Sequence, residues 1–403
     1  MILIRKYYKL LCIQSICIFL LPSCYSPDQI LRKQLKNNSR LSEIVFNPEY
    51  EVQIMYTRVD TKTGKTETSF FKTDTSTYFY PASTVKMPVA FLALEKVRNL
   101  QKQGFPITPE TTMHHGSGTT PQTEKTSEET VANGSPNIKR YIEKIFLVSD
   151  NDAYNRLYEF LGQDSINKIL KYKNIFTSSV INHRLGVPEF DFDDNRRSNP
   201  ISFSEEGKIV YTLPERFGVE NFVHHATNSV KGRGYIDQEN NLVKTPFDFS
   251  KKNYYNLVDM QNSLARVIHP EWFSKQEQFD VLPEDYIFLK ETMQKKPRDD
   301  RYYAQDTSLH DNYVKFFIFG DCSEPIPDHV KIYNKTGMAY GYLIDCAYIE
   351  DTSNNTSFYL TAMIHVNKNQ IYNDGIYEYK TIGIPFLAEL GRTMYLYTKK
   401  KSR

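Results

Sequence analysis

Residues 78–100, YFYPASTVKMPVAFLALEKVRNL, constrain the fold of this chain more than any other segment. From Ser83 to Leu100 apolar side chains occupy every face of the first helical turns, which predicts a helix buried at the centre of a domain. Pro88 fits poorly into a helix that already runs from Ser83, so we expect an irregular first turn. A content of 14% aromatic residues indicates a substantial core around this helix.

Strand patterns lie near both ends of the chain. Alternating side chains predict strands over 50–58 and 67–73, with a hairpin turn between them. Two adjacent strands are expected over 328–351 and 356–367, and a helix closes the chain. This order predicts an α+β fold, with an antiparallel sheet formed by both chain ends, flanking helices and a mostly helical part at about 95–300.

The predicted helical part contains two kinds of interruption. One helix should end near Val148 and the next should begin near Ala153, and further helices are expected over 256–268 and 284–294. Residues 182–200 have no clear period and many charges, which predicts an ordered loop.

The first residues have the pattern of a secretory signal. A basic stretch precedes the apolar run Leu10–Leu21, which is shorter than the roughly 20 residues that span a bilayer. Leu21-Pro22-Ser23-Cys24 then resembles the lipobox of bacterial lipoproteins, which predicts a signal peptide over 1–23 and a lipid on Cys24. An ordinary cleaved signal or a short anchor is the alternative. A lipidated chain would lie in the cell envelope, with 24–45 as tether and first helix.

The net charge and the cysteines give limited information about the binding partners of the protein. Removal of residues 1–23 lowers the formal net charge from +2 to −1, so nothing in the charge balance indicates nucleic acid. Cys322 and Cys346 remain beyond the lipidated cysteine and can pair in an oxidising compartment. His114-His115 and His224-His225 are weak metal candidates, because neighbours in sequence usually point apart. We therefore expect no metal ion and no cofactor. We also expect the protein to be a monomer.

Three short motifs combine a hydroxyl with an amine or amide. Ser83-Thr84-Val85-Lys86 opens the buried helix, and a spacing of three places Ser83 and Lys86 on one face. Ser149-Asp150-Asn151 lies at the break between two helices, and Lys335-Thr336-Gly337 lies in a late strand. Helix capping is the structural alternative for Ser83 and for the S-D-N motif, and a strand-end turn is the alternative for the last motif.

Order and setting separate these motifs from copies that occur elsewhere. A second K-T-G at Lys62 and a second S-x-x-K at Ser69 lie in the expected hairpin, ahead of the buried helix. In a strand, a spacing of three sends two side chains to opposite faces, so Ser69 and Lys72 cannot act together. These copies are best explained as the turn and second strand of the hairpin.

The sequence S-x-x-K, S-D-N, K-T-G, in this order and in these settings, resembles the class A β-lactamase family and its penicillin-binding relatives. The resemblance covers roughly residues 28–400, within a β-lactamase-like domain at 46–403. Extra segments interrupt it at about 201–250 and 297–320. It implies the fold of β-lactamases and transpeptidases, and an enzyme that acts on a cyclic amide.

The resemblance also implies roles for individual residues. Ser83 would be the nucleophile and Lys86 its proton acceptor, while Ser149 would pass a proton to the leaving nitrogen. The substrate would be held by Asn151 and by a second group in the late strand. That group comprises Lys335 and Thr336 for the substrate carboxylate, Gly337, and Met338, whose backbone N–H would complete an oxyanion hole with that of Ser83.

The segment after S-D-N departs from the family pattern. Class A β-lactamases carry a glutamate two residues after an arginine, and this glutamate activates the water that releases the acyl group. Arg184 matches the arginine, but Gly186 stands at the glutamate position. The nearby acids are alternative bases or members of a solvated acidic turn paired with Arg196 and Arg197, namely Glu189, Asp191, Asp193 and Asp194.

Three functions therefore remain open. The first is hydrolysis of the β-lactam amide through an acyl-enzyme on Ser83. The second is a cell-wall D,D-peptidase, whose substrate is a D-Ala-D-Ala-type peptide and which β-lactams acylate without turnover. The third is a non-catalytic lipoprotein that senses penicillins. No G-x-S-x-G occurs, so the nucleophile-elbow type of hydrolase lacks its motif.

Overall fold

The computed structural model describes residues 26–60 and 62–402. The predicted signal peptide and Cys24 lie outside the described residues. Within them, no helix is both long enough and apolar enough to span a membrane.

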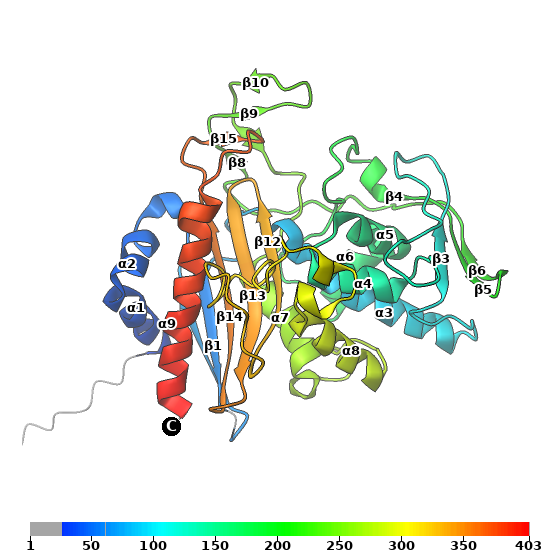
Figure 1. Ribbon diagram of the computed structural model, residues 1–403. Helices are drawn as coiled ribbons and strands as arrows, with labels where there is room; N and C mark the ends of the chain where they lie inside the picture. The colour runs from blue at the N-terminus through cyan, green and yellow to red at the C-terminus, as the bar shows by residue number, and fades with distance from the viewer. Residues whose placement is uncertain (1–25, 61, 403) are drawn as a thin grey trace, which may run out of the picture.

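A five-stranded antiparallel sheet forms the centre of the molecule, and its strands come from both ends of the chain (Figure 1). The order is β12-β13-β14-β1-β2, so β12 is an edge strand. This confirms the predicted α+β class. The strands are β1 (Gln53–Val59), β2 (Thr66–Phe71), β12 (Val330–Ala339), β13 (Tyr342–Asp351) and β14 (Thr356–His365).

The two hairpins of this sheet differ in how well they were predicted. The β1–β2 hairpin has the expected place, with Val59 opposite Thr66 across the turn. The segment 328–351, by contrast, forms two strands where the sequence predicts one. Tyr340 and Gly341 both have positive φ, at 54° and 81°, and form a tight turn between β12 and β13. Glycine adopts this conformation readily, so Gly341 marks a turn within a segment that otherwise has the pattern of a strand.

Helices cover both faces of the sheet. One face packs against α1 (Pro27–Asn37), α2 (Ser39–Val45) and α9 (Ile384–Ser402). The residues expected as tether and first helix thus form two helices on this face. The other face packs against the helical part, which contains α3 (Lys86–Lys102), α4 (Ile138–Leu147), α5 (Asn151–Leu161), α6 (Gln163–Tyr172), α7 (Leu257–Ile268) and α8 (Pro283–Gln294).

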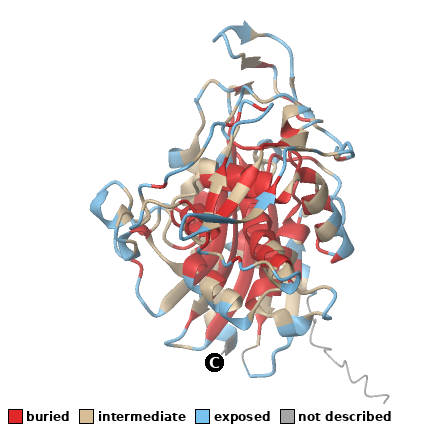
Figure 2. Ribbon diagram, turned by 90° about the vertical axis from the view of Figure 1, so that its right-hand side faces the viewer, coloured by how far each residue is buried: buried red, intermediate tan, exposed pale blue. Residues whose placement is uncertain are grey.

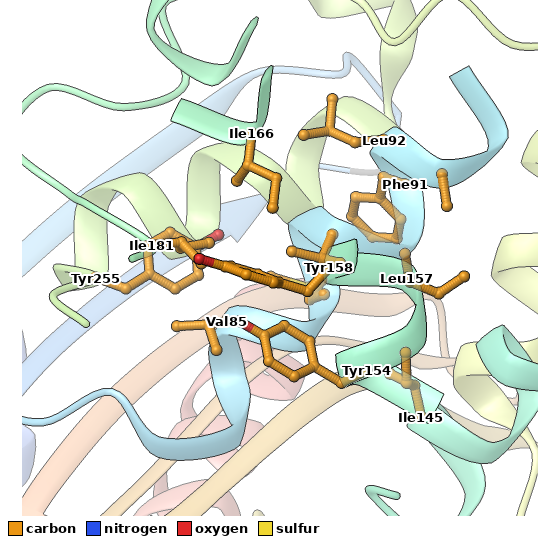
Figure 3. Packing of buried hydrophobic residues seen from close by; sticks show 14 of the residues in the cluster. Val85, Phe91, Leu92, Ile145, Tyr154, Leu157, Tyr158, Ile166, Ile181 and Tyr255 are labelled. Atoms are coloured by element: carbon orange, nitrogen blue, oxygen red, sulfur yellow. The ribbon is translucent and has the colours of Figure 1, made fainter. Parts of the chain in front are cut away.

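The predicted buried helix lies at the centre of the larger core. α3 buries twelve of its 17 residues, and Val85 just before it belongs to the same cluster as Phe91, Tyr154 and Leu157 (Figure 3). Its first turn is irregular as predicted, because a 3₁₀ turn, η2 (Ala82–Val85), precedes the α-helix. Burial is densest in the sheet and the helices against it, and exposure is greatest in the outer loops (Figure 2).

The extra segment at 201–250 contributes small sheets outside the core. Its first hairpin extends β3. Its later strands take part in two short pairs, β4–β7 and β8–β11, and in a three-stranded sheet in which β9 pairs with β10 and runs parallel to β15. The strands of these small sheets, including those from outside the segment, are β3 (Thr112–His115), β4 (Arg197–Ser198), β5 (Ile201–Glu205), β6 (Lys208–Leu213), β7 (Arg216–Phe217), β8 (Val230–Lys231), β9 (Gly234–Ile236), β10 (Leu242–Val243), β11 (Phe247–Asp248) and β15 (Ile371–Tyr372).

Candidate active site

Ser83 is presented by a strained turn at the start of the central helix. Ala82 has a φ of 49°, in the left-handed region that a residue with a Cβ adopts at a cost. The Thr84 hydroxyl donates to the carbonyl of Pro81 at 2.7 Å and closes the turn. Ser83 is half-exposed between buried neighbours, and within the described chain its hydroxyl makes no hydrogen bond. The capping alternative for Ser83 is therefore wrong, and the hydroxyl is free to react.

Lys86 is completely buried and is surrounded by acceptors from the S-D-N motif. Its Nζ donates to the carbonyl of Ser149 at 2.5 Å, to Oδ1 of Asn151 at 2.6 Å and to Oγ of Ser149 at 3.3 Å. Burial lowers the pKa of Lys86 well below its usual range, and the nearby Lys335 lowers it further. The three donated hydrogen bonds use all three protons of the ammonium group, and the lowered pKa eases the loss of one of them, which gives the neutral amine that can accept a proton.

The three residues of the S-D-N motif have different positions and contacts. Asp150 caps α5, since its Oδ1 accepts from the backbone N–H of Ala153 at 2.7 Å. Ser149 stands just before it with a φ of 57°. The capping alternative therefore holds for Asp150 only, and the side chains of Ser149 and Asn151 lie in the site.

Lys335 reaches the same site from the edge strand β12. Its Nζ donates to Oγ of Ser149 at 2.8 Å, which places that hydroxyl between the amines of Lys86 and Lys335. Gly337 packs directly on the nucleophile turn: a Cβ there would lie 2.7 Å from the carbonyl oxygen of Pro81 and 3.2 Å from the nitrogen of Ser83. Only glycine allows this approach. The three motifs, far apart in sequence, thus meet at one place.

Three polar residues in and next to β12 were not predicted as part of the site. Lys315 is buried and donates to Oδ1 of Asn334 at 2.7 Å and to the carbonyl of Met293 at 2.6 Å. Asn334 in turn donates to Oδ1 of Asp345 at 2.8 Å. Asp345 lies opposite Thr336 in the sheet register, so the network supports both neighbours of Lys335 on β12. Lys315 belongs to the extra segment at 297–320, for which the family pattern offered no signal.

This network sets the charge of Lys335. Burial lowers the pKa of Lys335 to about 7, and the positive charge of Lys315 acts in the same direction, while Asp345 opposes both. Burial also raises the pKa of Asp345 to about 6. The amine that would hold a substrate carboxylate therefore titrates near neutral pH, and an arriving carboxylate would favour its charged form.

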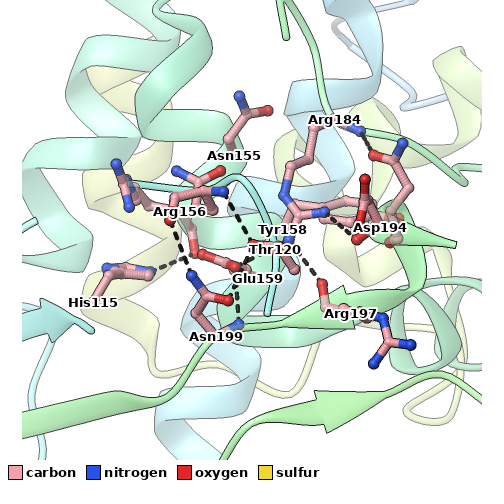
Figure 4. Close-up of polar contacts among 12 residues, drawn as sticks. His115, Thr120, Asn155, Arg156, Tyr158, Glu159, Arg184, Asp194, Arg197 and Asn199 are labelled. Carbon is pink, nitrogen blue, oxygen red and sulfur yellow. Dashed lines mark hydrogen bonds and ion pairs between the residues drawn. The ribbon is translucent and has the colours of Figure 1, made fainter. Parts of the chain in front are cut away.

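The loop after S-D-N is anchored by a fully buried ion pair (Figure 4). Nη2 of Arg184 lies 3.0 Å from Oε1 of Glu159, and both side chains have no exposed surface. The same guanidinium donates to the carbonyls of Asp194 and Arg197. Arg184 thus fixes the course of the predicted ordered loop without entering the site.

Gly186 stands against Asn151 where the family pattern calls for a glutamate. Its φ is 70°, and a Cβ at this position would lie 2.5 Å from Nδ2 of Asn151. The backbone therefore fills the space next to Asn151, and a side chain does not fit there unless Asn151 moves. The chain offers no carboxylate at residue 186 to activate a water.

Within the described chain, three of the four nearby acids are engaged in turn or surface contacts, and the fourth, Glu189, is not. Asp191 and Asp194 each accept a backbone N–H from the other and close a turn. Asp193 pairs with Arg196 at 3.0 Å, as the acidic-turn interpretation predicts. Arg197 makes no ion pair with these acids among the described residues; its guanidinium lies over the ring of Phe217 instead. Glu189 is exposed and lines a shallow cavity together with Asn151.

The remaining candidates do not form sites in the described part of the chain. No group of three or more His, Cys, Asp or Glu side chains is arranged to hold a metal ion there. His224 is buried and bonds through Nε2 to the carbonyl oxygen of Phe249. Cys322 and Cys346 are both free.

Comparison with known proteins agrees with the motifs and the fold. Residues 36–219 match the model of the β-lactamase enzyme family. A β-lactamase from Xanthomonas campestris pv. campestris is similar over 92% of this chain and 98% of its own, with a TM-score of 0.50 and 12% identity. A representative class A β-lactamase from Bacteroides cellulosilyticus is similar over 93% of this chain and 99% of its own, with a TM-score of 0.50 and 13% identity.

A search of curated proteins gave no match. The structural neighbours, at these identities, establish the fold. The chain therefore has the fold of β-lactamases, and its residues 36–219 are similar to the β-lactamase enzyme family.

Proposed function

We propose that this protein is a serine hydrolase that forms an acyl-enzyme on Ser83 and opens the amide bond of β-lactams. The observation that carries the proposal is the hydrogen-bonded chain from Lys86 through Ser149 to Lys335, beside a Ser83 hydroxyl that is free. A relay of this kind is needed for acyl transfer, in which a proton must leave the nucleophile and reach the departing nitrogen.

The acylation step follows from these positions. Oγ of Ser83 attacks the carbonyl carbon, and its proton passes to the neutral amine of Lys86. The C–N bond then breaks, and Ser149 delivers a proton to the nitrogen while it recovers one from Lys86. The backbone N–H groups of Ser83 and Met338 stabilise the negative oxygen, a contribution whose loss typically costs about 3–4 kcal/mol of barrier.

The glycine at residue 186 favours a second candidate function, that of a D,D-peptidase-like enzyme. β-Lactams would acylate such an enzyme, and the acyl group would be released slowly. Release of the acyl group needs a base that activates water, and the residue at the family's glutamate position has no side chain. Under this function the natural acyl donor is a D-Ala-D-Ala-type peptide of the cell wall.

One experiment separates these functions. The protein is incubated with a fluorescent penicillin, with a chromogenic cephalosporin and with an N-acyl-D-Ala-D-Ala peptide, and Ser83→Ala is the control. Steady cephalosporin turnover supports the β-lactamase function. A stable label with peptide cleavage supports the peptidase, and a stable label with neither turnover supports the sensory alternative. Equal labelling of the protein and of Ser83→Ala would refute an acyl-enzyme on Ser83.

We also propose that the protein is a lipoprotein of the cell envelope, anchored through Cys24 after removal of residues 1–23. The support is the basic stretch, the apolar run and the Leu21-Pro22-Ser23-Cys24 sequence. Metabolic labelling with a fatty acid should mark the full chain and should not mark Cys24→Ala. Labelling that survives this substitution would contradict the anchor.

A further inference from the structure

A cavity of about 330 Å³ opens beside the candidate active site, between the loop after S-D-N and residues 251–252. Its walls touch the site at three points. Tyr80 lies three residues before Ser83, and Tyr340 follows shortly after Gly337 on the same chain segment. Gly186, the third wall residue, is the one that packs against Asn151. A group attached to a substrate at Ser83 therefore has this cavity as a neighbour.

The cavity combines aromatic walls with an unpaired cation. Tyr80, Phe190, Phe192 and Tyr340 supply the rings. Lys252 is half-buried, and within the described chain its amine has neither a hydrogen bond nor an ion pair. Burial alone lowers the pKa of Lys252, because no acid is near enough to oppose it. A partly desolvated amine without a counter-ion is an incomplete interaction.

The other charged groups around the cavity are already engaged or neutral. Arg184 is paired with Glu159, and the Asp191 carboxylate accepts the backbone N–H of Asp194. His183 is neutral, because burial and the neighbouring Lys252 lower its pKa to about 3. Lys251 is exposed and lies over the ring of Phe192 at 5.5 Å. Among the charged side chains that line the cavity, Lys252 is the half-buried one whose amine has neither a hydrogen bond nor an ion pair in the described chain.

We propose that this cavity is a subsite for an anionic acyl side chain, with the carboxylate at Lys252 and the stem along the aromatic rings. The inference rests on the proposed acylation of Ser83 and specifies its substrate class: acyl donors whose acyl part ends in a carboxylate. A bound carboxylate gives Lys252 the partner that the protein does not supply, and charge-assisted hydrogen bonds of this kind are among the stronger ones.

The test uses two cephalosporins that differ by one charge. One has a glutaryl side chain on the ring amine, and the other has the corresponding primary amide in place of the terminal carboxylate. Acylation of Ser83 is followed by intact mass spectrometry, and the ratio of second-order rate constants is the readout. We expect the carboxylate compound to react about tenfold faster, and we expect 0.5 M salt to reduce the ratio.

Lys252→Met should bring this ratio close to one. Lys244→Met, which removes an exposed lysine that does not line the cavity, should leave the ratio unchanged. A wild-type ratio near one, or a ratio that survives both salt and Lys252→Met, would overturn the subsite while leaving Ser83 as nucleophile. If neither cephalosporin acylates Ser83, the proposed function fails and the subsite falls with it. The salt series needs no variant, so the test holds even if Lys252→Met does not fold.

Discussion

The two sides of the candidate site differ in completeness. On the side of α3 and β12, Lys86, Ser149 and Lys335 form one hydrogen-bonded chain next to a free Ser83. On the side of the loop after S-D-N, Gly186 brings backbone against Asn151. Three of the four local acids hold turns or a surface pair, and Glu189 is exposed at a cavity that Asn151 also lines. Attack on a carbonyl needs the first set of groups, and release of the acyl group needs a base from the second. The groups proposed for acylation thus lie together in the structure, whereas residue 186 has no side chain and, of the four acids in the loop, only Glu189 is unengaged among the described residues.

The largest expected effect tests the complete side. Lys86→Met removes the proposed proton acceptor and should slow acylation by about 10³-fold. Lys96→Met is the matched control, because Lys96 lies in the same helix and bonds to the carbonyl of Phe160, away from the site. Acylation rates from a fluorescent penicillin would measure both. Similar losses in the two variants would mean that a lysine in α3 matters for packing only.

The second prediction tests how much the buried ion pair stabilises the loop after S-D-N. Glu159→Gln leaves Arg184 buried without its partner and should cost about 3 kcal/mol of unfolding free energy. The control is Asp193→Asn, which breaks the surface pair with Arg196 and should cost less than about 1 kcal/mol. Urea denaturation measures both values. Equal costs would show that the buried pair does not anchor the loop.

The third prediction concerns the contact between the two sides. Gly186→Ala places a methyl group 2.5 Å from the Asn151 amide and should displace it, with acylation slowed about tenfold. Gly207→Ala is the matched control: Gly207 also has a positive φ, at 79°, but its Cβ would meet nothing within 4 Å. Gly207→Ala should destabilise the fold slightly and leave acylation unchanged. If the two variants acylate equally fast, Gly186 does not position Asn151.

The smallest expected effect is a pH dependence on the complete side. The pKa of Lys335 is about 7, so the charged amine that attracts a substrate carboxylate is lost as pH rises through that value. The second-order acylation rate constant should therefore fall above pH 7.

Lys315→Met would sharpen this result. Burial lowers the pKa of Lys315 to about 7 as well, so its positive charge is present mainly below that pH. Removal of this charge should raise the pKa of Lys335 and increase acylation by at most about twofold near pH 7, with little change at pH 8. A pH–rate profile from pH 5.5 to 9 measures the shift, and the melting temperature reports whether the core is intact. A profile that Lys315→Met leaves in place would separate Lys315 from the charge of Lys335.

The fold could be predicted well where local pattern decides the structure. The apolar faces of α3, the break between α4 and α5 and the β1–β2 hairpin all follow from periodicity and turn chemistry over a few residues. The turn at Tyr340-Gly341 was missed for the opposite reason, since apolar residues continue on both sides of it. Lys315 and Asp345 were missed because their contacts join segments that only the folded sheet brings together.

The sequence by itself determined the order and type of the reacting groups: a serine and a lysine on a buried helix, a second serine at a helix break and a second lysine on a strand. Tertiary structure alone decided which hydroxyl is free, since Asp150 and not Ser149 caps its helix, and Ser83 caps none. It also decided the charge of Lys335 and the closeness of Gly337 to Ser83 and of Gly186 to Asn151. Desolvation and steric contact depend on what surrounds a group in space, and neighbours in space are set by the fold rather than by adjacency along the chain.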